Sequence, residues 1–512
     1  MNALLFSMPD VMPMFRPDAW RLPNLGISSI AANTSDHDVY CADLMARREN
    51  LSAAVQEAMR RVRPRLVGLS AMSFQYDTAL KVAELVREVD PDVPVVLGGY
   101  HATLLYEDVT KAERSSRLLD FLIRGEGETA FNMLVHALDG EGDLAEVPGL
   151  SWKHRDKWVH NARGALEDLK TLKIPKRSAR LWNGEYFFRG VQKGSGLRIL
   201  LPSHIYQVID VLETSRGCTM PCNFCSMRHM YGRTFRTYDT DRVVADIADS
   251  KKRGTQWVLF ADDNITLDVK RFECLCDAII ESGHTDVSYI IQASSAGIAS
   301  SERLVRKMDR ANFRIVFLGI ENVSERNLRQ MKKGDIVEKT RAAIRYLHQY
   351  KILIVGGMII GLPDDREVDI AENYEFFRTE QVDFFGDQIA TPYPRTELRQ
   401  ELLRDGLVTN VDDYRRYNGF WANVRTKHLT SEELQFLRWK CRRRYSSFEN
   451  ITPSIREAYP VYALMHLLVI RPMRRLKRVL RNWNRTEREI FREDMRRCEA
   501  LNDFFGDGGS SP

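Results

Sequence analysis

Three closely spaced cysteines constrain this chain more than any other feature. Cys218, Cys222 and Cys225 follow a Cys-x3-Cys-x2-Cys spacing, and Gly217 and Pro221 lie within the same stretch. Glycine and proline interrupt helix and strand periodicity, so we expect a loop here. A loop lets three thiolates converge on one point, whereas a strand would alternate them between its two faces. The segment is therefore a candidate metal centre.

The same spacing indicates which metal group the cysteines hold. Thiolate ligands with tight Cys-x2-Cys spacing are typical of iron–sulfur clusters. Three cysteines leave one iron of a four-iron cubane free for a small molecule. Zinc is an alternative that needs a fourth ligand, for which His229 is the only nearby candidate. Three unrelated cysteines are the remaining alternative, and the spacing and loop setting favour the cluster.

The stretch from Thr214 to Cys225 resembles the Cys-x3-Cys-x-aromatic-Cys signature of the radical S-adenosylmethionine (radical SAM) enzymes, with Phe224 at the aromatic position. The resemblance implies that Cys218, Cys222 and Cys225 hold a [4Fe–4S] cluster whose free iron is chelated by SAM. In that family the reduced cluster cleaves SAM to a 5′-deoxyadenosyl radical, which abstracts hydrogen from the substrate. It also implies an external electron donor of the flavodoxin or ferredoxin type.

Composition indicates an ordinary multidomain globular chain. Its 512 residues suffice for about two to four domains, and 44% hydrophobic with 28% charged residues is an average balance. The five cysteines outside the triplet are scattered, which argues against a disulfide framework and for a reducing compartment. The sequence shows no basic-apolar leader and no apolar run near the ~18 residues of a membrane span. We therefore expect a cytoplasmic protein.

The first part of the chain alternates predicted strands and helices. The predicted strands are 3–8, 39–42, 66–70, 93–98 and 119–123, and the predicted helices are 27–32, 51–62, 78–88 and 128–138. This alternation predicts an α/β domain with a doubly wound parallel sheet over residues 1–140. Ligands of such sheets bind beyond the carboxyl ends of the strands.

Glycine-bearing loops follow three of these strands. They are Ser70-Ala-Met-Ser73, Gly98-Gly99-Tyr-His101 and Arg124-Gly125-Glu126-Gly-Glu128. Glycine lets a ligand approach the backbone closely, although many doubly wound folds carry it here. Together these loops resemble those of the cobalamin-binding domain that precedes many radical SAM domains. The cobalamin contacts that this resemblance implies are Ser70, Gly98, Gly99, His101, Gly125 and Glu126.

One motif of other cobalamin proteins is absent. The Asp-x-His-x-x-Gly sequence that supplies a lower axial histidine is not present, and Asp36-His37-Asp38 lacks its spacing. Many cobalamin-dependent radical SAM proteins also lack this motif, so its absence does not exclude cobalamin. A vestigial or substrate-binding version of the fold stays open as an alternative. His101 could equally be a satisfied loop histidine rather than a metal ligand.

A second alternating region follows a connector over residues 141–205. The predicted strands are 206–212, 257–260, 287–292, 315–320, 352–360 and 384–389, and the predicted helices are 243–250, 269–282, 301–311, 339–350 and 367–380. Six strand–helix units over residues 206–405 predict a partial (β/α)6 barrel, shorter than the full eight units. Barrel active sites lie at the carboxyl ends of the strands.

Polar residues stand at two of these strand ends. Asp262 and Asp263 follow the second strand and Gln292 ends the third. The resemblance implies that the two aspartates meet the SAM amino group and that Gln292 contacts its ribose. The alternative for Asp263 or Asn264 is a helix N-cap.

Three further strand ends resemble family segments. Glu321, in Gly319-Ile-Glu-Asn, is implied to lie near the SAM ribose or the active-site cavity, and its alternative is an ion pair with Arg314. Gly356 and Gly361 are implied to flank the adenine, although strand glycines more often mark a bulge or close packing. Tyr393 in Thr-Pro-Tyr-Pro-Arg is implied to face the substrate, with arginine replacing the family's usual glycine.

The remainder, residues 406–512, is predicted to be helical, and 406–450 to close the open side of the barrel. Residues 471–497 hold eleven Arg or Lys against four Asp or Glu, although the whole chain carries only +5. Over 461–497 an apolar run precedes Pro472 and a basic amphipathic helix, which suits an anionic membrane surface. A helix packed on the domain with a solvated basic face is the alternative. No recognition module supports nucleic-acid binding.

Together these features predict a cobalamin-dependent radical SAM enzyme that methylates an unactivated carbon of a hydrophobic or natural-product substrate. A lipid-like substrate and a location at the inner face of the membrane follow if the basic helix binds lipid. An oxidative cyclase resembling the anaerobic cyclase of magnesium-protoporphyrin IX monomethyl ester is the alternative enzyme. The non-enzyme alternative is an iron–sulfur or cobalamin sensor. The catalytic residues we expect are Glu321 and Tyr393.

Overall fold

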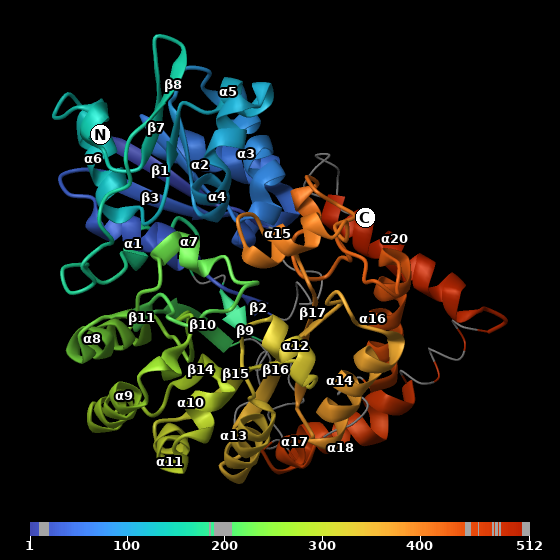
Figure 1. The fold of residues 1–512 in the computed structure, drawn as a ribbon. Coiled ribbons are helices and arrows are strands. Elements are labelled where there is room, and N and C mark those ends of the chain that lie inside the picture. Colours follow the sequence, from blue (N-terminus) through green and yellow to red (C-terminus); the bar gives the residue numbers. More distant parts are fainter. Residues whose placement is uncertain are drawn as a thin grey trace.

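Two β-sheets organise the computed structural model (Figure 1). It describes residues 1–9, 20–183, 186–188, 207–445, 452–458, 460–473, 476, 480 and 483–503. The first sheet has the order β3-β1-β4-β5-β6-β7-β8. Its strands are β1 (Asn2–Ser7), β3 (Asp38–Asp43), β4 (Leu66–Ser70), β5 (Val95–Gly98), β6 (Phe121–Ile123), β7 (Leu150–His154) and β8 (Lys157–His160). The first five are parallel, as the sequence predicts, and β7 and β8 add an antiparallel hairpin from the segment expected as a connector.

Helices cover both faces of this sheet because alternate side chains of each strand point to opposite faces. In β1, Ala3 and Leu5 pack with the side chains of α1 (Leu25–Asn33) and α6 (Glu128–Leu138). Leu4 and Phe6 pack with the helices of the other face. Those helices are α2 (Leu51–Val62), α3 (Tyr76–Val89), α4 (Tyr100–Lys111) and α5 (Glu113–Leu118). The predicted doubly wound fold is confirmed, and α4 and α5 are additions to it.

The second sheet is the curled, incomplete barrel in the lower half of Figure 1. Six parallel strands stand in chain order, and their helices form the outer layer. The strands are β10 (Gln207–Leu212), β13 (Trp257–Phe260), β14 (Ser288–Ser294), β15 (Phe313–Glu321), β16 (Leu353–Ile360) and β17 (Phe384–Ile389). The covering helices are α8 (Thr240–Lys251), α9 (Val269–Glu281), α11 (Glu302–Arg310), α13 (Val337–Gln349) and α14 (Glu367–Thr379). The predicted six-stranded partial barrel is confirmed.

Both edges of the partial barrel are covered. At one edge β9 (Phe187–Phe188) pairs antiparallel with β10, and β2 (Trp20–Arg21) pairs with β9. A strand from the N-terminal part of the chain thus completes the second sheet. At the other edge α16 (Ser431–Tyr445) packs on α14, and Arg438 and Arg442 of α16 form ion pairs with the buried Asp387 of β17.

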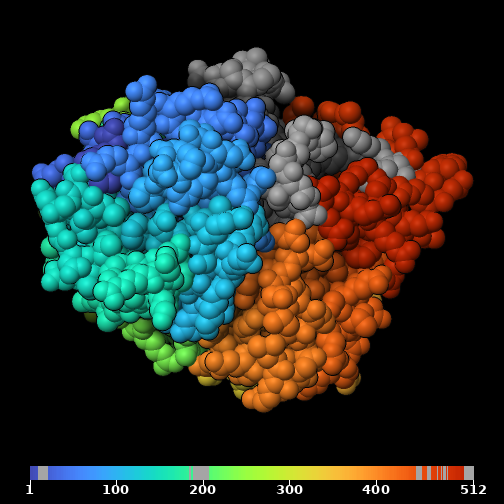
Figure 2. Space-filling model, turned by 90° about the horizontal axis from the view of Figure 1, so that it is seen from above, coloured from blue at the N-terminus to red at the C-terminus, as the bar shows by residue number. Residues whose placement is uncertain are grey.

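The expectation of helix throughout 406–450 is wrong for residues 406–430. This segment holds only the 3-10 turn η8 (Tyr414–Arg416) and a bridge between Val408 and Val424. Gly406 and Gly419 have φ of 64° and 77°, left-handed values that a helix cannot contain. Its turn η8 packs on the N-terminal domain, whereas the Gly419 carbonyl accepts the N–H of Ile389 at the end of β17. Figure 2 shows residues near 400 (orange) directly against the N-terminal domain (blue to teal).

The C-terminal part is helical where it is described. It comprises α17 (Pro453–Ala458), α18 (Pro460–Met465), a π-helical turn (His466–Ile470) and α20 (Glu487–Asp503). The π-turn ends two residues before Pro472, and the helix continues through that proline. A proline lacks an N–H and clashes with the carbonyl four residues earlier, and a wider turn relieves this conflict. Among the described residues, no helix has the length and apolar character to cross a membrane.

Candidate active site

The loops after β5 and β6 of the first sheet contact the loop after β10 of the second. The Tyr100 hydroxyl donates a hydrogen bond to Met227 Sδ at 2.8 Å, and Glu126 pairs with Arg216 at 2.9 Å. Both contacts join carboxyl strand ends, where parallel sheets bind their ligands. The two expected ligand sites therefore lie next to each other.

The three cysteines lie in the loop that the sequence predicts. A short ribbon of β11 (Ser215–Arg216) and β12 (Arg236–Thr237) closes the loop, which also contains α7 (Met227–Tyr231). Gly217 has a φ of 88°, and a Cβ there would collide with the Thr234 carbonyl. Only glycine fits this point, where the chain turns from the ribbon into the cysteines.

The cysteine thiols are suited to a metal cluster by their burial and grouping. Cys222 is 7% exposed, and Cys218 and Cys225 are half-buried. Burial raises the pKa of all three, that of Cys225 to about 11, and neighbouring thiolates raise the pKa values of Cys222 and Cys225 further. Thiolates that lie close together repel each other. A bound metal cation removes this repulsion because it binds the thiolate form. In the described part of the chain, no three Cys, His, Asp or Glu side chains stand close enough for a single metal ion. A cubane differs because each of its thiolates binds a separate iron.

Two aspartates from the end of β13 hold this loop. The fully buried Asp262 carboxylate accepts hydrogen bonds from Thr214 N–H at 3.0 Å and from the Thr214 and Ser215 hydroxyls. Asp263 accepts the Gly217 N–H at 2.8 Å, and burial raises its pKa to about 7. The Gln292 amide donates to the Asp262 carbonyl at 3.4 Å. Asp262 therefore anchors the cysteine loop.

Asn264 provides the N-cap that was the alternative for this segment. Its side chain accepts a hydrogen bond from Thr266 N–H at the start of a 3-10 turn (Ile265–Leu267). Asp263 caps no helix, and its carboxylate is half-exposed toward the loop. Of Asp263 and Asn264, only Asp263 therefore has a side chain that can still face a ligand.

Glu321 lies in a β-bulge with a φ of 64°, an unusual backbone conformation for a residue with a side chain. Its carboxylate forms a 2.8 Å ion pair with Lys333, and both side chains are more than four-fifths buried. The partner named in the alternative, Arg314, instead pairs with Asp309 at 2.6 Å. No sequence pattern indicated Lys333, which follows Lys332 in a polar loop.

Lys333 also faces the cysteine loop. Its ammonium lies 5.9 Å from the centre of the Phe224 ring. Burial lowers the pKa of Lys333, but the charges of Glu321 and the Cys222 thiolate outweigh burial and raise it above the usual range. Lys333 is therefore a permanent cation beside the candidate cluster site.

Packing explains the first of the two candidate glycines, and backbone conformation explains the second. A Cβ on Gly356 would lie 2.7 Å from the Phe377 ring and 2.9 Å from Val382. Gly361 has a φ of 82°, and its N–H donates to Asp365 at 2.8 Å. Close packing, which was the alternative for strand glycines, therefore accounts for Gly356.

The Tyr393 segment reaches toward both domains. Tyr393 is half-exposed, and burial together with the Cys225 charge raises its pKa to about 12. The Leu398 N–H donates to the Asn223 carbonyl at 3.1 Å, so this segment lies beside the cysteine loop. Arg395 has a φ of 64°, so it keeps the left-handed backbone that the family's glycine would adopt. Its guanidinium lies 5.6 Å from the centre of the Tyr106 ring on α4.

His101 is buried among aromatic rings at the start of α4. It stacks on Tyr76 at 3.8 Å between ring centres and meets the edge of Tyr414 at 5.4 Å. Burial lowers its pKa to about 3, so the ring is neutral, and its Nδ1 has no hydrogen-bond partner among the described residues. His101 is therefore not a histidine satisfied by hydrogen bonds on both nitrogens.

The neutral state of His101 leads to a prediction about acid stability. Between pH 6.5 and 3 the unfolded chain binds a proton at this residue and the folded chain does not, so stability falls as pH falls. At pH 5 this loss amounts to about 2 kcal/mol. We expect His101→Phe to remove that part of the pH dependence in denaturant titrations between pH 7 and 5. A wild-type slope in the variant would contradict it.

The other expected cobalamin contacts lie at the same edge of the first sheet. Ser70 ends β4 and Gly98 ends β5. Gly99 has a φ of 91°, and a Cβ there would lie 2.7 Å from the Ala71 carbonyl. A Cβ on Gly125 would lie 2.7 Å from Arg163. The Glu126 carboxylate is engaged by two arginines.

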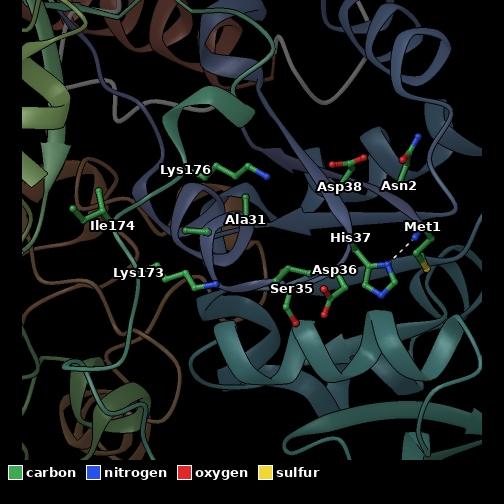
Figure 3. A pocket seen from close by; sticks show the side chains of 12 residues that line it. Met1, Asn2, Ala31, Ser35, Asp36, His37, Asp38, Lys173, Ile174 and Lys176 are labelled. Carbon is green, nitrogen blue, oxygen red and sulfur yellow. Dashed lines mark hydrogen bonds between the residues drawn. The ribbon is translucent and has the colours of Figure 1, made fainter.

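A cavity of about 650 Å³ lies elsewhere (Figure 3). It is lined by Met1, Asn2, His37 and Lys176 at the amino ends of β1 and β3. The N-terminal amine and His37 Nδ1 are 2.7 Å apart within it. This is the edge of the sheet opposite the candidate cofactor loops, so the cavity is separate from the site.

This architecture defines a radical SAM domain preceded by a cobalamin-binding-type domain. The B12 binding domain family matches residues 19–135, and the Radical SAM superfamily matches residues 212–377. An uncharacterized methyltransferase of Pyrococcus horikoshii is 29% identical over 88% of this chain and 92% of that protein. The anaerobic magnesium-protoporphyrin IX monomethyl ester cyclase of Cereibacter sphaeroides is 27% identical over 82% of this chain and 65% of its own length.

Among solved structures, the cobalamin-dependent S-adenosylmethionine radical enzyme OxsB, with aqua-cobalamin and SAM bound, superimposes with a TM-score of 0.67. The match covers 99% of this chain and 77% of OxsB at 17% identity, so it shows a shared fold. The chain therefore belongs to the radical SAM enzymes that carry a B12-binding domain. The prediction of this family from the sequence is confirmed, and an enzyme is favoured over a sensor.

Proposed function

We propose that this protein is a cobalamin-dependent radical SAM enzyme that transfers a methyl group to an unactivated carbon. The direct contact between the loops of the B12-binding sheet and the cysteine loop carries the proposal. A methyl donor held at the first sheet would lie next to a radical generated at the second. Methyltransferase relatedness over most of the chain supports methyl transfer.

The residues at the site suit this chemistry. Cys218, Cys222 and Cys225 would hold the [4Fe–4S] cluster, and the glycine-bearing loops after β5 and β6 would receive cobalamin. When bound, these groups and SAM supply the radical and the methyl group. Asp263, whose carboxylate already accepts the Gly217 N–H at the loop, would accept a hydrogen bond from the SAM amino group. Gln292, near the carboxyl end of β14, and Glu321, at the end of β15, would contact the ribose, and Tyr393 would face the substrate.

Isotope labelling tests methyl transfer. SAM carrying a deuterated methyl group is supplied to the anaerobically reconstituted protein with extracts of candidate hydrophobic substrates. The proposal predicts a product heavier by one labelled methyl group, formed together with 5′-deoxyadenosine. A new product without label would favour the oxidative cyclase, which the similarity to the Cereibacter sphaeroides cyclase makes the second candidate.

We propose further that the C-terminal helical segment docks on an anionic phospholipid surface, which would make a lipid-like substrate accessible. Most large exposed apolar side chains of the described residues lie in this segment. They are Leu464, Leu467, Leu468, Val469, Met473, Leu476, Leu480 and Trp483. In sequence they alternate with Arg471, Arg474, Arg475, Lys477, Arg478 and Arg481, of which only Arg471 lies among the described residues. Apolar residues flanked by cations suit an interfacial helix.

Vesicle binding tests this surface. We expect the full chain to co-sediment with vesicles containing phosphatidylglycerol and not with pure phosphatidylcholine. Leu476→Asp combined with Leu480→Asp should weaken binding at least about tenfold, because two exposed leucines that would enter the lipid surface are replaced by carboxylates. Val368→Asp, at a site on α14 that is 57% exposed, is the control and should bind normally. Unchanged binding of the double variant, or self-association through this face, would contradict the proposal.

A further inference from the structure

Glu126 joins the B12-binding domain to both ends of the cysteine loop. Its Oε1 accepts hydrogen bonds from Arg216 Nη1 at 2.9 Å and from Arg236 Nη2 at 3.0 Å. Its Oε2 lies 3.0 Å from Arg236 Nη1 and also accepts the Glu167 N–H at 2.9 Å. Arg216 is in β11 and Arg236 in β12, the two strands that close the loop. One carboxylate therefore ties the two strands together from outside their own domain.

This contact is buried on all sides. The side chains of Glu126, Arg216 and Arg236 are 5%, 8% and 20% exposed. Glu128 and Glu213 each lie 2.7 Å from Arg216 and complete its surroundings. Burial lowers the pKa of Arg216, but these carboxylates outweigh it and raise the pKa well above the usual value. Buried ion pairs add little net stability and are best attested as devices that fix one arrangement.

Two further contacts hold the same loop from the same side. Tyr100, next to Gly99, bonds to Met227, which follows Cys225 by two residues. Arg163 donates hydrogen bonds to the carbonyls of His229 and Met230 at 2.8 Å and packs on Gly125. The residues expected to bind cofactor thus lie in loops that also grip the cysteine loop.

We propose that Glu126 is a positioning residue that fixes the cysteine loop against the B12-binding domain and thereby sets the separation of cluster and cobalamin. Both carboxylate oxygens are occupied by protein donors, so Glu126 acts through the loop and not on a cofactor. The separation between cluster and cobalamin rests on the proposed function. The contacts by which Glu126 holds the cysteine loop exist in the protein without cofactors. Two measurements address these parts separately.

The first measurement is hydrogen–deuterium exchange of residues 215–237 in the cofactor-free protein. Glu126→Gln should raise exchange there about tenfold, because a charge-assisted link between the strands is lost. Glu128→Gln is the matched control: Glu128 begins α6 two residues after Glu126, is equally buried and also pairs with Arg216, but it forms no ion pair with Arg236. Its exchange should stay within about twofold of wild type.

A second variant tests the link from the other end. Arg236→Gln leaves the Arg216 pair intact and is less buried, so it suits the case in which Glu126→Gln does not fold. It should raise exchange as Glu126→Gln does. Equal exchange in wild type and both link variants, or an equal rise in Glu128→Gln, would overturn the proposal whatever cofactors bind.

The second measurement is the distance between cob(II)alamin and the reduced cluster, both paramagnetic, by pulsed electron paramagnetic resonance on the reconstituted protein. The proposal predicts one narrow distance distribution in wild type and in Glu128→Gln, and a broadened one in Glu126→Gln. A narrow wild-type distance in Glu126→Gln would overturn it. No cobalamin signal in the wild type would instead contradict the proposed function and leave the exchange result to decide the role of Glu126.

Discussion

Cys222→Ala is expected to abolish the cluster and to lower 5′-deoxyadenosine formation from SAM at least about 100-fold. The reason is that each protein-bound iron of the cluster is held by one cysteine thiolate. Cys222 is the most buried of the three cysteines, and two thiolates in a closed ribbon loop cannot replace it. The measurement is iron and sulfide content with the deoxyadenosine assay, both under anaerobic conditions. Full cluster content in the variant would contradict the assignment of this cysteine as a ligand.

Cys274→Ala is the matched control for that experiment. Cys274 lies on α9 and is exposed, so its loss opens no cavity and removes no ligand. Cluster content and deoxyadenosine formation should equal those of the wild type. A loss in this variant as large as in Cys222→Ala would mean that oxidation or handling, and not ligation, explains the result.

Lys333→Met is expected to destabilise the apoprotein by about 3 kcal/mol, because it leaves the Glu321 carboxylate buried without its partner. The adjacent Lys332 provides an unusually close control. It is 47% exposed and paired with Glu397 at the surface, so Lys332→Met should cost less than about 1 kcal/mol. Urea unfolding of both variants measures the difference.

A second substitution separates the ion pair from the loss of packing at Lys333. Adding Glu321→Gln to Lys333→Met removes the unpaired charge, so we expect stability to recover in part. If the single variant were as stable as the wild type, or if the second change lowered stability further, the buried pair would not be what holds Glu321 in its strained bulge.

The architecture was predictable because buried apolar residues recur in the sequence with the period of a strand or a helix. Strands such as Trp257–Phe260 and Phe384–Ile389 are short apolar runs between helices with amphipathic spacing, and the structure confirms both ranges. The cysteine loop was also predictable from the sequence, because glycine and proline interrupt helix and strand periodicity there. Residues 406–430 were misread as helix because their aromatic residues do not share one helix face: Tyr414 packs on His101 of the N-terminal domain, and Phe420 packs under Arg438 of α16.

The ion-pair and hydrogen-bond partners of buried charged residues show no such pattern in the sequence. Position at a strand end indicated that Glu126 and Asp262 would lie at the site, but not that arginines and hydroxyls would occupy their carboxylates. Glu321 pairs with Lys333 and not with Arg314, because Arg314 lies at the opposite end of β15, whereas Lys333 follows the short helix α12 (Glu325–Gln330) that comes after the strand. Such pairings depend on tertiary contacts between segments far apart in sequence.

The most direct test of the account is anaerobic reconstitution with iron, sulfide and hydroxocobalamin, followed by gel filtration, a visible spectrum and the deoxyadenosine assay under reduction. The account predicts that cobalamin and the cluster stay with the protein and that SAM yields 5′-deoxyadenosine. Loss of cobalamin on the column with deoxyadenosine still formed would contradict the cobalamin-dependent function, and no deoxyadenosine from an intact cluster, even with substrate present, would contradict the radical SAM chemistry itself.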